Sequence, residues 1–207
     1  MKTEKLILFD LGGVVLDIDF HRIWQHWSQT SGVDLSNAEL TLGPAAGDNE
    51  AFHQFERGQI SEPAFFESTA RRTGMKMPFE AWRAGWNAIF IGEMPGTQTL
   101  LKELSGQARL MALSNINAPH HAYTEQHFSK LLSSFESVVY SHEVNLRKPE
   151  KAIFDLIVRR SGVRPENILF FDDMPSNVQG AVQAGLCAEV FENAEQARMS
   201  IAKFLKE

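Results

Sequence analysis

The sequence contains a single cysteine, Cys187, and no long hydrophobic run. One cysteine excludes an internal disulfide and is typical of proteins from a reducing compartment. A membrane-spanning helix needs about 20 consecutive, mostly apolar residues, and no stretch of this sequence approaches that length. We therefore expect a cytoplasmic protein that does not interact with a membrane.

Positive charge is also scarce. The 20 Lys and Arg residues stand against 26 Asp and Glu residues, which gives a net charge of −6. Proteins that bind nucleic acid ordinarily carry a basic patch or stripe, and this sequence shows no basic stripe. We expect a small-molecule partner rather than nucleic acid, and a chain that is a monomer or a weak homodimer.

Short apolar runs are the most informative feature that is present. In a chain of 207 residues that is 43% hydrophobic, enough material exists for one sizeable core. Four runs have the length and composition of strands that are buried on both faces. They are residues 6–9, 110–113, 137–140 and 168–171.

Helical patterns lie between and after these runs, over residues 95–106, 148–162 and 176–185. The last of them opens on Ser176, a residue type that often caps the start of a helix. Strands that alternate with helices predict an α/β fold with a doubly wound parallel sheet.

Residues 18–92 differ from the rest, because they show helical stripes and no clear strand run. The expected helices cover residues 20–27, 52–56, a segment that begins at Ser61, and residues 78–90. All four tryptophans of the chain lie in this region, and we expect them to form its core. We predict a helical subdomain of residues 18–92, inserted into a catalytic core of residues 1–17 and 93–207.

Polar residues follow each of the four apolar runs. In open α/β sheets, ligands bind beyond the carboxyl ends of the strands. The residues in question are Asp10 after the first run, Ser114 and Asn115 after the second, Lys148 in the segment after the third, and Asp172 and Asp173 after the fourth. Each alone is more often a turn, cap or solvated residue, but their joint occurrence at one sheet edge favours a functional site.

The acidic members of this set suit phosphoryl transfer. Asp10 is the candidate nucleophile, which would form an aspartyl-phosphate. Asp10 and Asp173 are the candidate ligands of Mg²⁺, a hard cation that accepts oxygen donors. Asp172 would support this site, directly or through a water molecule.

The remaining members can bind a phosphoryl group. Ser114 and the backbone N–H of Asn115 can donate hydrogen bonds to its oxygens. Lys148 can neutralise the charge that spreads over those oxygens and keep two carboxylates ionised side by side.

The ordered motifs that carry these residues resemble the haloacid dehalogenase superfamily. "FDLGG" around Asp10, "LSN" at Ser114, "RKPE" at Lys148 and "FFDDMPSN" from Phe170 to Asn177 are similar to the four motifs of that family. The resemblance implies a Rossmann-like core with an inserted helical cap, and it adds Asn177 as a supporting residue of the site. Within the superfamily, the phrases "EAFHQFERGQIS" and "LRKPE" resemble bacterial α-D-glucose-1-phosphate phosphatases.

Gly12 departs from the family pattern. Most phosphatases of this family carry an aspartate there, which supplies a backbone carbonyl to Mg²⁺ and a side chain that protonates the leaving oxygen. The resemblance implies that the carbonyl of Gly12 is a Mg²⁺ ligand. A glycine has no side chain for the second task, so the proton must come from water or another group, and Asp17 and Asp19 are the nearest acids in the sequence.

Histidine and arginine side chains offer weaker signals. His53 and Arg57, with His21 and Arg22, lie in the predicted subdomain, where they could contact the distal part of a sugar phosphate. The three histidines of "PHHAYTEQHF" (His120, His121 and His127) lack an i, i+4 pair, so a polar helix face is favoured over a metal site.

The favoured function is a Mg²⁺-dependent phosphatase that acts on a small phosphorylated metabolite, with a sugar phosphate such as glucose 1-phosphate as the expected substrate. A 2-haloacid dehalogenase would also use the Asp10 carboxylate, on carbon, but it needs no metal and leaves the paired aspartates unexplained. A phosphate-sensing protein without turnover is the third alternative, because Gly12 lacks the acid.

Overall fold

The computed structural model describes residues 4–36 and 50–206. Its centre is a five-stranded sheet in the order β5-β4-β1-β6-β7, and all neighbouring strands are parallel. The strands are β1 (Leu6–Phe9), β4 (Arg109–Ser114), β5 (Ser137–Tyr140), β6 (Ile168–Asp172) and β7 (Cys187–Val190). The predicted doubly wound α/β fold is confirmed, and the four apolar runs are strands β1, β4, β5 and β6.

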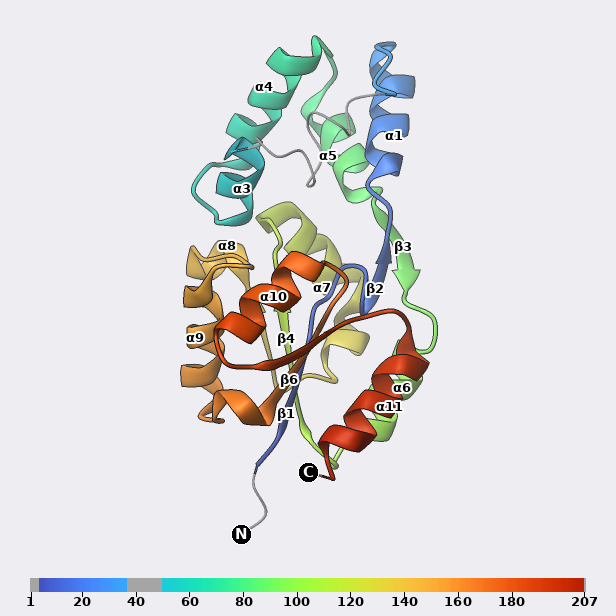
Figure 1. The fold of residues 1–207 in the computed structure, drawn as a ribbon. Coiled ribbons are helices and arrows are strands. Elements are labelled where there is room, and N and C mark those ends of the chain that lie inside the picture. The colour runs from blue at the N-terminus through green and yellow to red at the C-terminus, as the bar shows by residue number, and fades with distance from the viewer. Residues whose placement is uncertain (1–3, 37–49, 207) are drawn as a thin grey trace.

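Helices cover both faces of this sheet (Figure 1). One face is covered by α6 (Thr97–Leu104), α7 (Ala118–Leu132) and α11 (Ala194–Phe204). The other is covered by α9 (Lys151–Ser161) and α10 (Pro175–Gln183), with the short α8 (Ser141–Val144) and the 3-10 turn η1 (Pro165–Asn167) at its borders.

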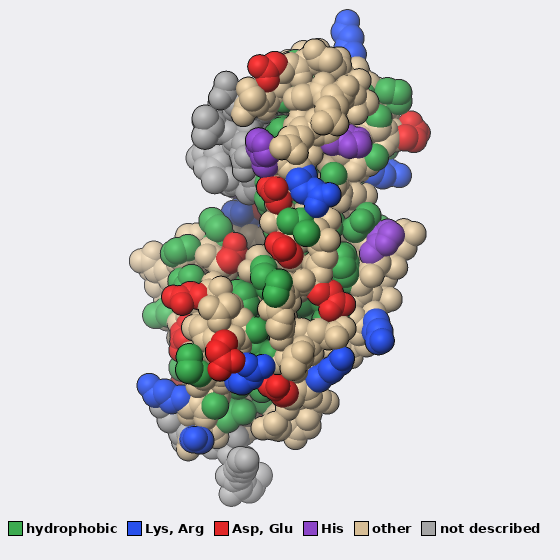
Figure 2. Space-filling model, turned by 90° about the vertical axis from the view of Figure 1, so that its right-hand side faces the viewer, with side chains coloured by type: hydrophobic (Ala, Val, Ile, Leu, Met, Phe, Trp, Pro, Cys, Tyr) green, Lys and Arg blue, Asp and Glu red, His purple; other side chains and the backbone are tan. Residues whose placement is uncertain are grey.

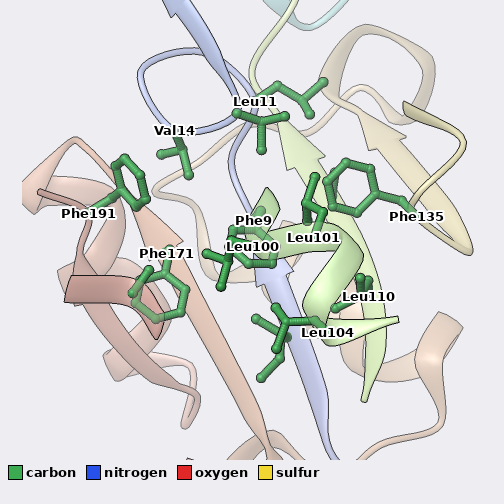
Figure 3. Close-up of a cluster of buried hydrophobic side chains, with 14 of the residues drawn as sticks. Phe9, Leu11, Val14, Leu100, Leu101, Leu104, Leu110, Phe135, Phe171 and Phe191 are labelled. Atoms are coloured by element: carbon green, nitrogen blue, oxygen red, sulfur yellow. The ribbon is translucent and has the colours of Figure 1, made fainter. Parts of the chain in front are cut away.

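The central strand β1 explains why two layers of helices are needed. Successive side chains of a strand point to opposite faces. Leu6 and Leu8 pack with the hydrophobic cluster on the α9 and α10 face, whereas Ile7 and Phe9 pack with the cluster on the α6 and α11 face. Figure 3 shows Phe9 between Leu100 of α6 and neighbouring apolar side chains of that second cluster. Because β1 is apolar on both faces, only a sheet covered on both faces can bury it.

The first and last parts of the expected helical region are strands. β2 (Leu16–Ile18) and β3 (Phe90–Glu93) form a small antiparallel ladder in which Asp17 pairs with Gly92. The prediction that residues 18–92 lack a strand is therefore wrong at both ends. The helix expected over residues 78–90 ends at Asn87, because Phe90 pairs with Ile18 instead of continuing the helix.

Four helices of the described chain stand beyond the sheet edge, and we call them the helical layer (Figure 1). They are α1 (His21–Ser31), α3 (Glu50–Glu56), α4 (Glu62–Thr73) and α5 (Phe79–Asn87). They pack around their own hydrophobic cluster, and Figure 2 shows them as a separate lobe above the core.

Tryptophan side chains fill the helical layer. Trp24, Trp27, Trp82 and Trp86 are each at most 3% exposed. The ring of Trp27 stacks on those of Trp82 and Trp86, with centroids 5.6 and 5.9 Å apart. The prediction that these four residues form a core is confirmed.

Helix starts were predicted with mixed success. Ser61 caps α4 as expected, since its hydroxyl accepts a hydrogen bond from the N–H of Ala64 at 3.4 Å. Ser176 does not cap α10, because Pro175 takes the first helical position and Met174 the cap position. Among the described residues, no helix is both long enough and apolar enough to cross a bilayer.

Candidate active site

The predicted polar residues meet at the carboxyl ends of three adjacent strands. β1 lies between β4 and β6, and Phe9 is in register with Ala112 and Phe171. Asp10 directly follows β1, while Ser114 ends β4 and Asp172 ends β6. The parallel register therefore places the three side chains beside one another at one edge of the sheet.

Lys148 links two of the carboxylates. Its ammonium Nζ lies 2.7 Å from Oδ1 of Asp10 and 2.6 Å from Oδ2 of Asp172. All three residues are buried, with exposed fractions of 1%, 7% and 0%. A buried charge is costly unless it is paired and hydrogen-bonded, so the lysine and the two acids depend on one another.

The pKa values reflect this dependence. Burial raises the pKa of Asp10 well above its ordinary value; the Lys148 ammonium opposes this rise, and the neighbouring Asp172 carboxylate adds to it. Burial alone would lower the pKa of Lys148, but the two carboxylates more than offset it and raise that pKa. Lys148 is therefore a fixed positive charge at the strand ends.

Asp172 and Asp173 occupy different environments although they are adjacent in the sequence. Oδ1 of Asp172 accepts hydrogen bonds from the N–H of Met174 and from Nδ2 of Asn177, both at 2.9 Å. Asp173 is exposed, and desolvation and the charge of Asp172 raise its pKa. Asp172 is thus held in place by neighbours, and Asp173 turns toward solvent.

An oxygen-rich cluster results. One carboxylate oxygen each from Asp10, Asp172 and Asp173 lies within 4.8 Å of the others. Carboxylate oxygens are the donors that a hard divalent cation such as Mg²⁺ prefers, so the donor set fits this ion. Gly13, at φ +77°, allows the close approach, because a Cβ there would lie 2.6 Å from the carboxylate of Asp173.

Asn115 supports the lysine. Its Nδ2 donates to the carbonyl of Lys148 at 2.9 Å, and its Oδ1 accepts from the N–H of Lys148 at 2.8 Å. This pair of hydrogen bonds joins the end of β4 to the segment before α9. The side chain of Asn115 therefore holds the backbone of Lys148 in place. Nothing in the sequence indicated this role.

A cavity of about 300 Å³ lies between the sheet edge and the helical layer. The core supplies most of the predicted site residues to its lining: Asp10, Gly12, Ser114, Asn115, Lys148, Asp173 and Asn177. The helical layer and the chain beside it supply Ile18, Phe20, Phe52, His53 and Glu56. Asp172 lies beneath the lining, where it contacts Lys148.

The two residues of the predicted helical subdomain that were expected to contact substrate have different positions. His53 is half-buried and lines the cavity, and burial together with the positive charge of Arg147 lowers its pKa. Arg57 is not among the lining residues. Its guanidinium pairs with Glu150 and so joins the helical layer to the core. The expectation that Arg57 contacts substrate has no support from this geometry.

Glu56 and Arg147 line the cavity and were not predicted as site residues. Arg147 donates from Nε to Oε2 of Glu56 at 3.0 Å, across the junction between core and helical layer. Burial raises the pKa of Glu56, and the adjacent arginine opposes this rise. The residues are far apart in the sequence, so only the tertiary structure shows that they meet.

His120 is buried and not part of a polar helix face, which corrects the prediction for this residue. Its Nε2–H donates to the carbonyl of Trp86 at 2.9 Å, and its Nδ1 accepts from Nδ2 of Asn117 at 3.2 Å. Oδ1 of Asn117 in turn accepts from the indole N–H of Trp86 at 3.1 Å. Burial lowers the pKa of His120 to about 4, so a neutral imidazole holds α7 against α5.

The acids nearest to Gly12 in the sequence are outside the cavity lining. Neither Asp17 nor Asp19 is among the residues that line it, and Oδ1 of Asp19 accepts from the N–H of His21 at 2.8 Å. Gly12 itself is not in the left-handed region, which Gly13 occupies. A Cβ at Gly12 would meet the end of the Ile18 side chain at 2.7 Å. The glycine is therefore not required there by its backbone conformation.

Comparison with known proteins agrees with this site. The profile of the haloacid dehalogenase-like hydrolase family matches residues 4–185. The chain is 26% identical to a D-ribitol-5-phosphate phosphatase of Bacteroides thetaiotaomicron over 97% of this chain and 98% of that protein. It is also 26% identical to a phosphatase of Mycobacterium tuberculosis over 96% of this chain and 92% of that protein.

Solved structures share the fold. A haloacid dehalogenase family enzyme of B. thetaiotaomicron, solved with magnesium and inorganic phosphate, has a TM-score of 0.77, 24% identity and coverage of 92% of this chain and 95% of that one. A 2-haloacid dehalogenase of Pseudomonas syringae has a TM-score of 0.64 and 20% identity, with coverage of 98% and 100%. The family match extends over most of the chain and includes all four strand ends of the site. The chain therefore belongs to the haloacid dehalogenase-like hydrolases.

Proposed function

We propose that this hydrolase is a Mg²⁺-dependent phosphatase that cleaves a small phosphorylated metabolite through an aspartyl-phosphate at Asp10. The observation that carries the proposal is the buried Asp10–Lys148–Asp172 triad beside the exposed Asp173. The phosphatase names of the relatives that match almost end to end support a phosphoric monoester hydrolase.

Asp10 is the nucleophile in this proposal. Its Oδ1 accepts hydrogen bonds from the N–H of Leu11 at 2.7 Å and is paired with Lys148 at the same distance. Because both contacts go to Oδ1, we assign the attack on phosphorus to Oδ2. These two contacts fix the orientation of the carboxylate, which lowers the entropic cost of the attack.

Asp10, Asp173 and the carbonyl of Gly12 are the proposed Mg²⁺ ligands. A bound divalent cation supplies positive charge that keeps Asp10 ionised and offsets the charge on the phosphoryl oxygens. Asp172 lies beneath the cavity lining and accepts hydrogen bonds from Lys148 and Asn177, which fixes the position of both side chains. Asp173 is the acid best placed to exchange water for metal, because it is exposed.

Ser114, the N–H of Asn115 and Lys148 are the proposed phosphate-binding groups. Ser114 is 3% exposed at the end of β4 and lines the same cavity as Lys148. Preorganised donors of this kind act in a site of low dielectric, where each contributes more than it would in water. The side chain of Asn115 is excluded from this task by its bonds to Lys148.

The helical layer is the proposed cap, which selects the substrate. Its wall of the cavity combines apolar side chains such as Phe20 and Phe52 with the polar His53 and Glu56. A small polyol or sugar phosphate suits a cavity of about 300 Å³ that is lined by polar residues of the core together with His53 and Glu56. D-ribitol 5-phosphate, by analogy with the relative, and glucose 1-phosphate, by the cap phrases, are the two substrates to test first.

A metal-dependence assay on an aryl phosphate tests the proposal. Turnover that requires Mg²⁺ and releases phosphate is the expected result. Halide release from a 2-haloacid without metal would instead make the chain a dehalogenase, and phosphate binding without any turnover would make it a sensor. A panel of phosphorylated sugars and polyols, run with the same protein, then ranks the substrates.

A further inference from the structure

Two histidines and a glutamate lie together outside the cavity, where α7 meets α8. His121 belongs to α7, and His142 and Glu143 belong to α8. The nitrogen and carboxylate atoms that they offer all lie within 4.8 Å of one another. None of the three lines the cavity, so the proposed reaction gives them no role.

The spacing of these atoms matches a tetrahedral metal ion. Nδ1 of His121 lies 3.3 Å from Nε2 of His142 and 3.7 Å from Oε1 of Glu143. Zinc binds imidazole nitrogen at about 2.0–2.1 Å with tetrahedral geometry, which places two ligand nitrogens about 3.3 Å apart. The two rings therefore have the separation that one ion requires. Glu143 is exposed and can close the remaining gap by rotating its side chain.

Neighbouring groups orient both rings. Nδ1 of His142 lies 3.1 Å from the carbonyl oxygen of Ile116, which can only accept. That nitrogen therefore carries the proton, and Nε2 presents its lone pair to His121. Metal-binding histidines commonly donate their second ring N–H to a carbonyl or a carboxylate in this way.

His121 has a carboxylate on its far side, at a longer distance. Its Nε2 lies 3.7 Å from Oε1 of Glu125, and that oxygen also accepts from the hydroxyl of Tyr140 at 2.8 Å. When Nδ1 binds a metal, the imidazole proton is on Nε2, and a small rotation of the exposed Glu125 side chain brings its carboxylate within hydrogen-bond distance of that N–H. Each ring thus has an acceptor on the side away from the cluster.

We propose that His121, His142 and Glu143 bind a divalent transition-metal ion of the zinc class. Imidazole donors suit zinc, nickel and copper, whereas Mg²⁺ prefers oxygen donors, so this site and the acidic cluster select different ions. Three protein ligands leave a fourth position for water. The ion ties α7 to α8, and the hydroxyl of Ser141 in α8 donates to the carbonyl of Glu56 at 2.6 Å, so the ion stiffens the core side of the junction with the helical layer.

Co²⁺ titration of the full chain, in excess Mg²⁺ to saturate the acidic cluster, tests the site spectroscopically. We expect the intense visible absorption of tetrahedral cobalt and its loss on addition of one equivalent of Zn²⁺. The Asp173→Asn variant should keep this signal, because the substitution changes the acidic cluster and not the histidine site. Loss of the signal in that variant, or only the weak spectrum of octahedral cobalt in the wild type, would overturn the proposal.

Variants assign the ligands. Removal of a group that only orients a ligand typically weakens metal binding about 10–100-fold, so we expect that range for Glu125→Gln and a larger loss for His142→Ala. His127→Ala is the matched control, since His127 is an exposed histidine of the same helix. Unchanged zinc affinity in His142→Ala, or an equal loss in His127→Ala, would contradict the assignment.

Thermal unfolding gives a readout that is independent of the spectra. At a Zn²⁺ concentration about 100 times the dissociation constant, the midpoint of the wild type should rise by about 5–10 °C. Glu143→Gln changes an exposed residue, so it should fold normally and show a smaller rise. If His142→Ala fails to fold, Glu143→Gln still decides the question, because an undiminished rise and affinity would exclude Glu143 from the site.

Discussion

The two walls of the cavity are built in different ways. On the core side, charged groups at the ends of β1 and β6 are buried and held by ion pairs of 2.6–2.7 Å. On the side of the helical layer, stacked aromatic rings provide the packing, and few polar groups face the cavity. The comparison supports the proposal that the sheet fixes the geometry of the reaction and that the helical layer selects the substrate.

The largest effects should come from Lys148 and Asp173, with opposite signatures. Lys148→Met leaves two buried carboxylates without their partner, and breaking a buried ion pair costs about 3–5 kcal/mol of unfolding free energy. Asp173→Asn should leave stability unchanged or raise it, because it removes a charge that desolvation and the neighbouring Asp172 carboxylate both disfavour. Urea unfolding of both variants measures the difference.

Magnesium titrations sharpen the same contrast. In Asp173→Asn, the lost ligand should weaken Mg²⁺ binding at every pH. In Lys148→Met, loss of the cation raises the pKa of Asp10 further, so Mg²⁺ affinity should recover as the pH rises. Equal deficits that do not change with pH would contradict the division of roles between the two residues.

Gly12→Asp should have the next largest effect, on substrates with poor leaving groups. A positioned general acid typically contributes about 10²–10⁴-fold, and an unoptimised one should reach the lower end for alkyl phosphates while changing aryl phosphates little. The backbone at Gly12 accepts a side chain, and the end of the Ile18 side chain must move.

Rates across a series of leaving groups measure this gain, with Gly12→Asn as the control that adds bulk without an acid. A folded, Mg²⁺-binding Gly12→Asp variant without a selective gain would mean that another residue already donates the proton. His53 and Glu56, which line the cavity, would then be the first to mutate.

His120 should make the junction between the walls sensitive to pH. Its folded pKa of about 4 is below its unfolded value of 6.5, so the unfolded chain binds the proton more readily. The stability that neutral His120 contributes to the folded protein is fully present above pH 6.5 and is lost as the pH falls toward 4. Between pH 7.5 and 5, the wild type should lose about 2 kcal/mol more than His120→Gln. Urea unfolding at both pH values checks this, and a wild type and variant that change equally would disprove it.

His53→Ala should have the smallest effect and should act on specificity. A remote contact helps a sugar or polyol phosphate reach the transition state but gives a small aryl phosphate little. We expect kcat/KM for sugar or polyol phosphates to change about tenfold relative to kcat/KM for an aryl phosphate. A change of this size is typical of one lost hydrogen bond, and hydrolysis of the aryl phosphate should be preserved. Arg57→Ala is the control, since Arg57 pairs with Glu150 and does not line the cavity. A uniform loss across all substrates in His53→Ala would show a structural role.

The sequence predicts the sheet well where strands are buried on both faces. β1, β4 and β6 are continuous apolar runs, and their ends locate Asp10, Ser114 and Asp172. β7 escaped prediction because it is an edge strand whose residues are partly exposed, with Glu189 in its middle. β2 and β3 were not predicted because they are short and their pairing joins segments that lie far apart in the sequence.

The contacts that join the helical layer to the core could not be predicted from the sequence, although His53 was correctly expected to face the cavity. Nothing in the local pattern shows that Glu56 meets Arg147, 91 residues later, or that His120 lies beneath Trp86. These contacts depend on the angle at which one layer packs on the other. Periodicity indicates which face of a helix is apolar, but it does not indicate what that face meets.

Trapping of the reaction intermediate tests the central claim most directly. The enzyme is mixed with an aryl phosphate and Mg²⁺, quenched in acid and reduced with borohydride. We expect homoserine at position 10, because borohydride reduces an acyl phosphate and spares a free carboxylate. Asp10→Asn, which keeps the shape but lacks the nucleophile, should give neither the product nor turnover. Reduction at another residue, or turnover that persists in Asp10→Asn, would show that the core wall does not perform the reaction through Asp10.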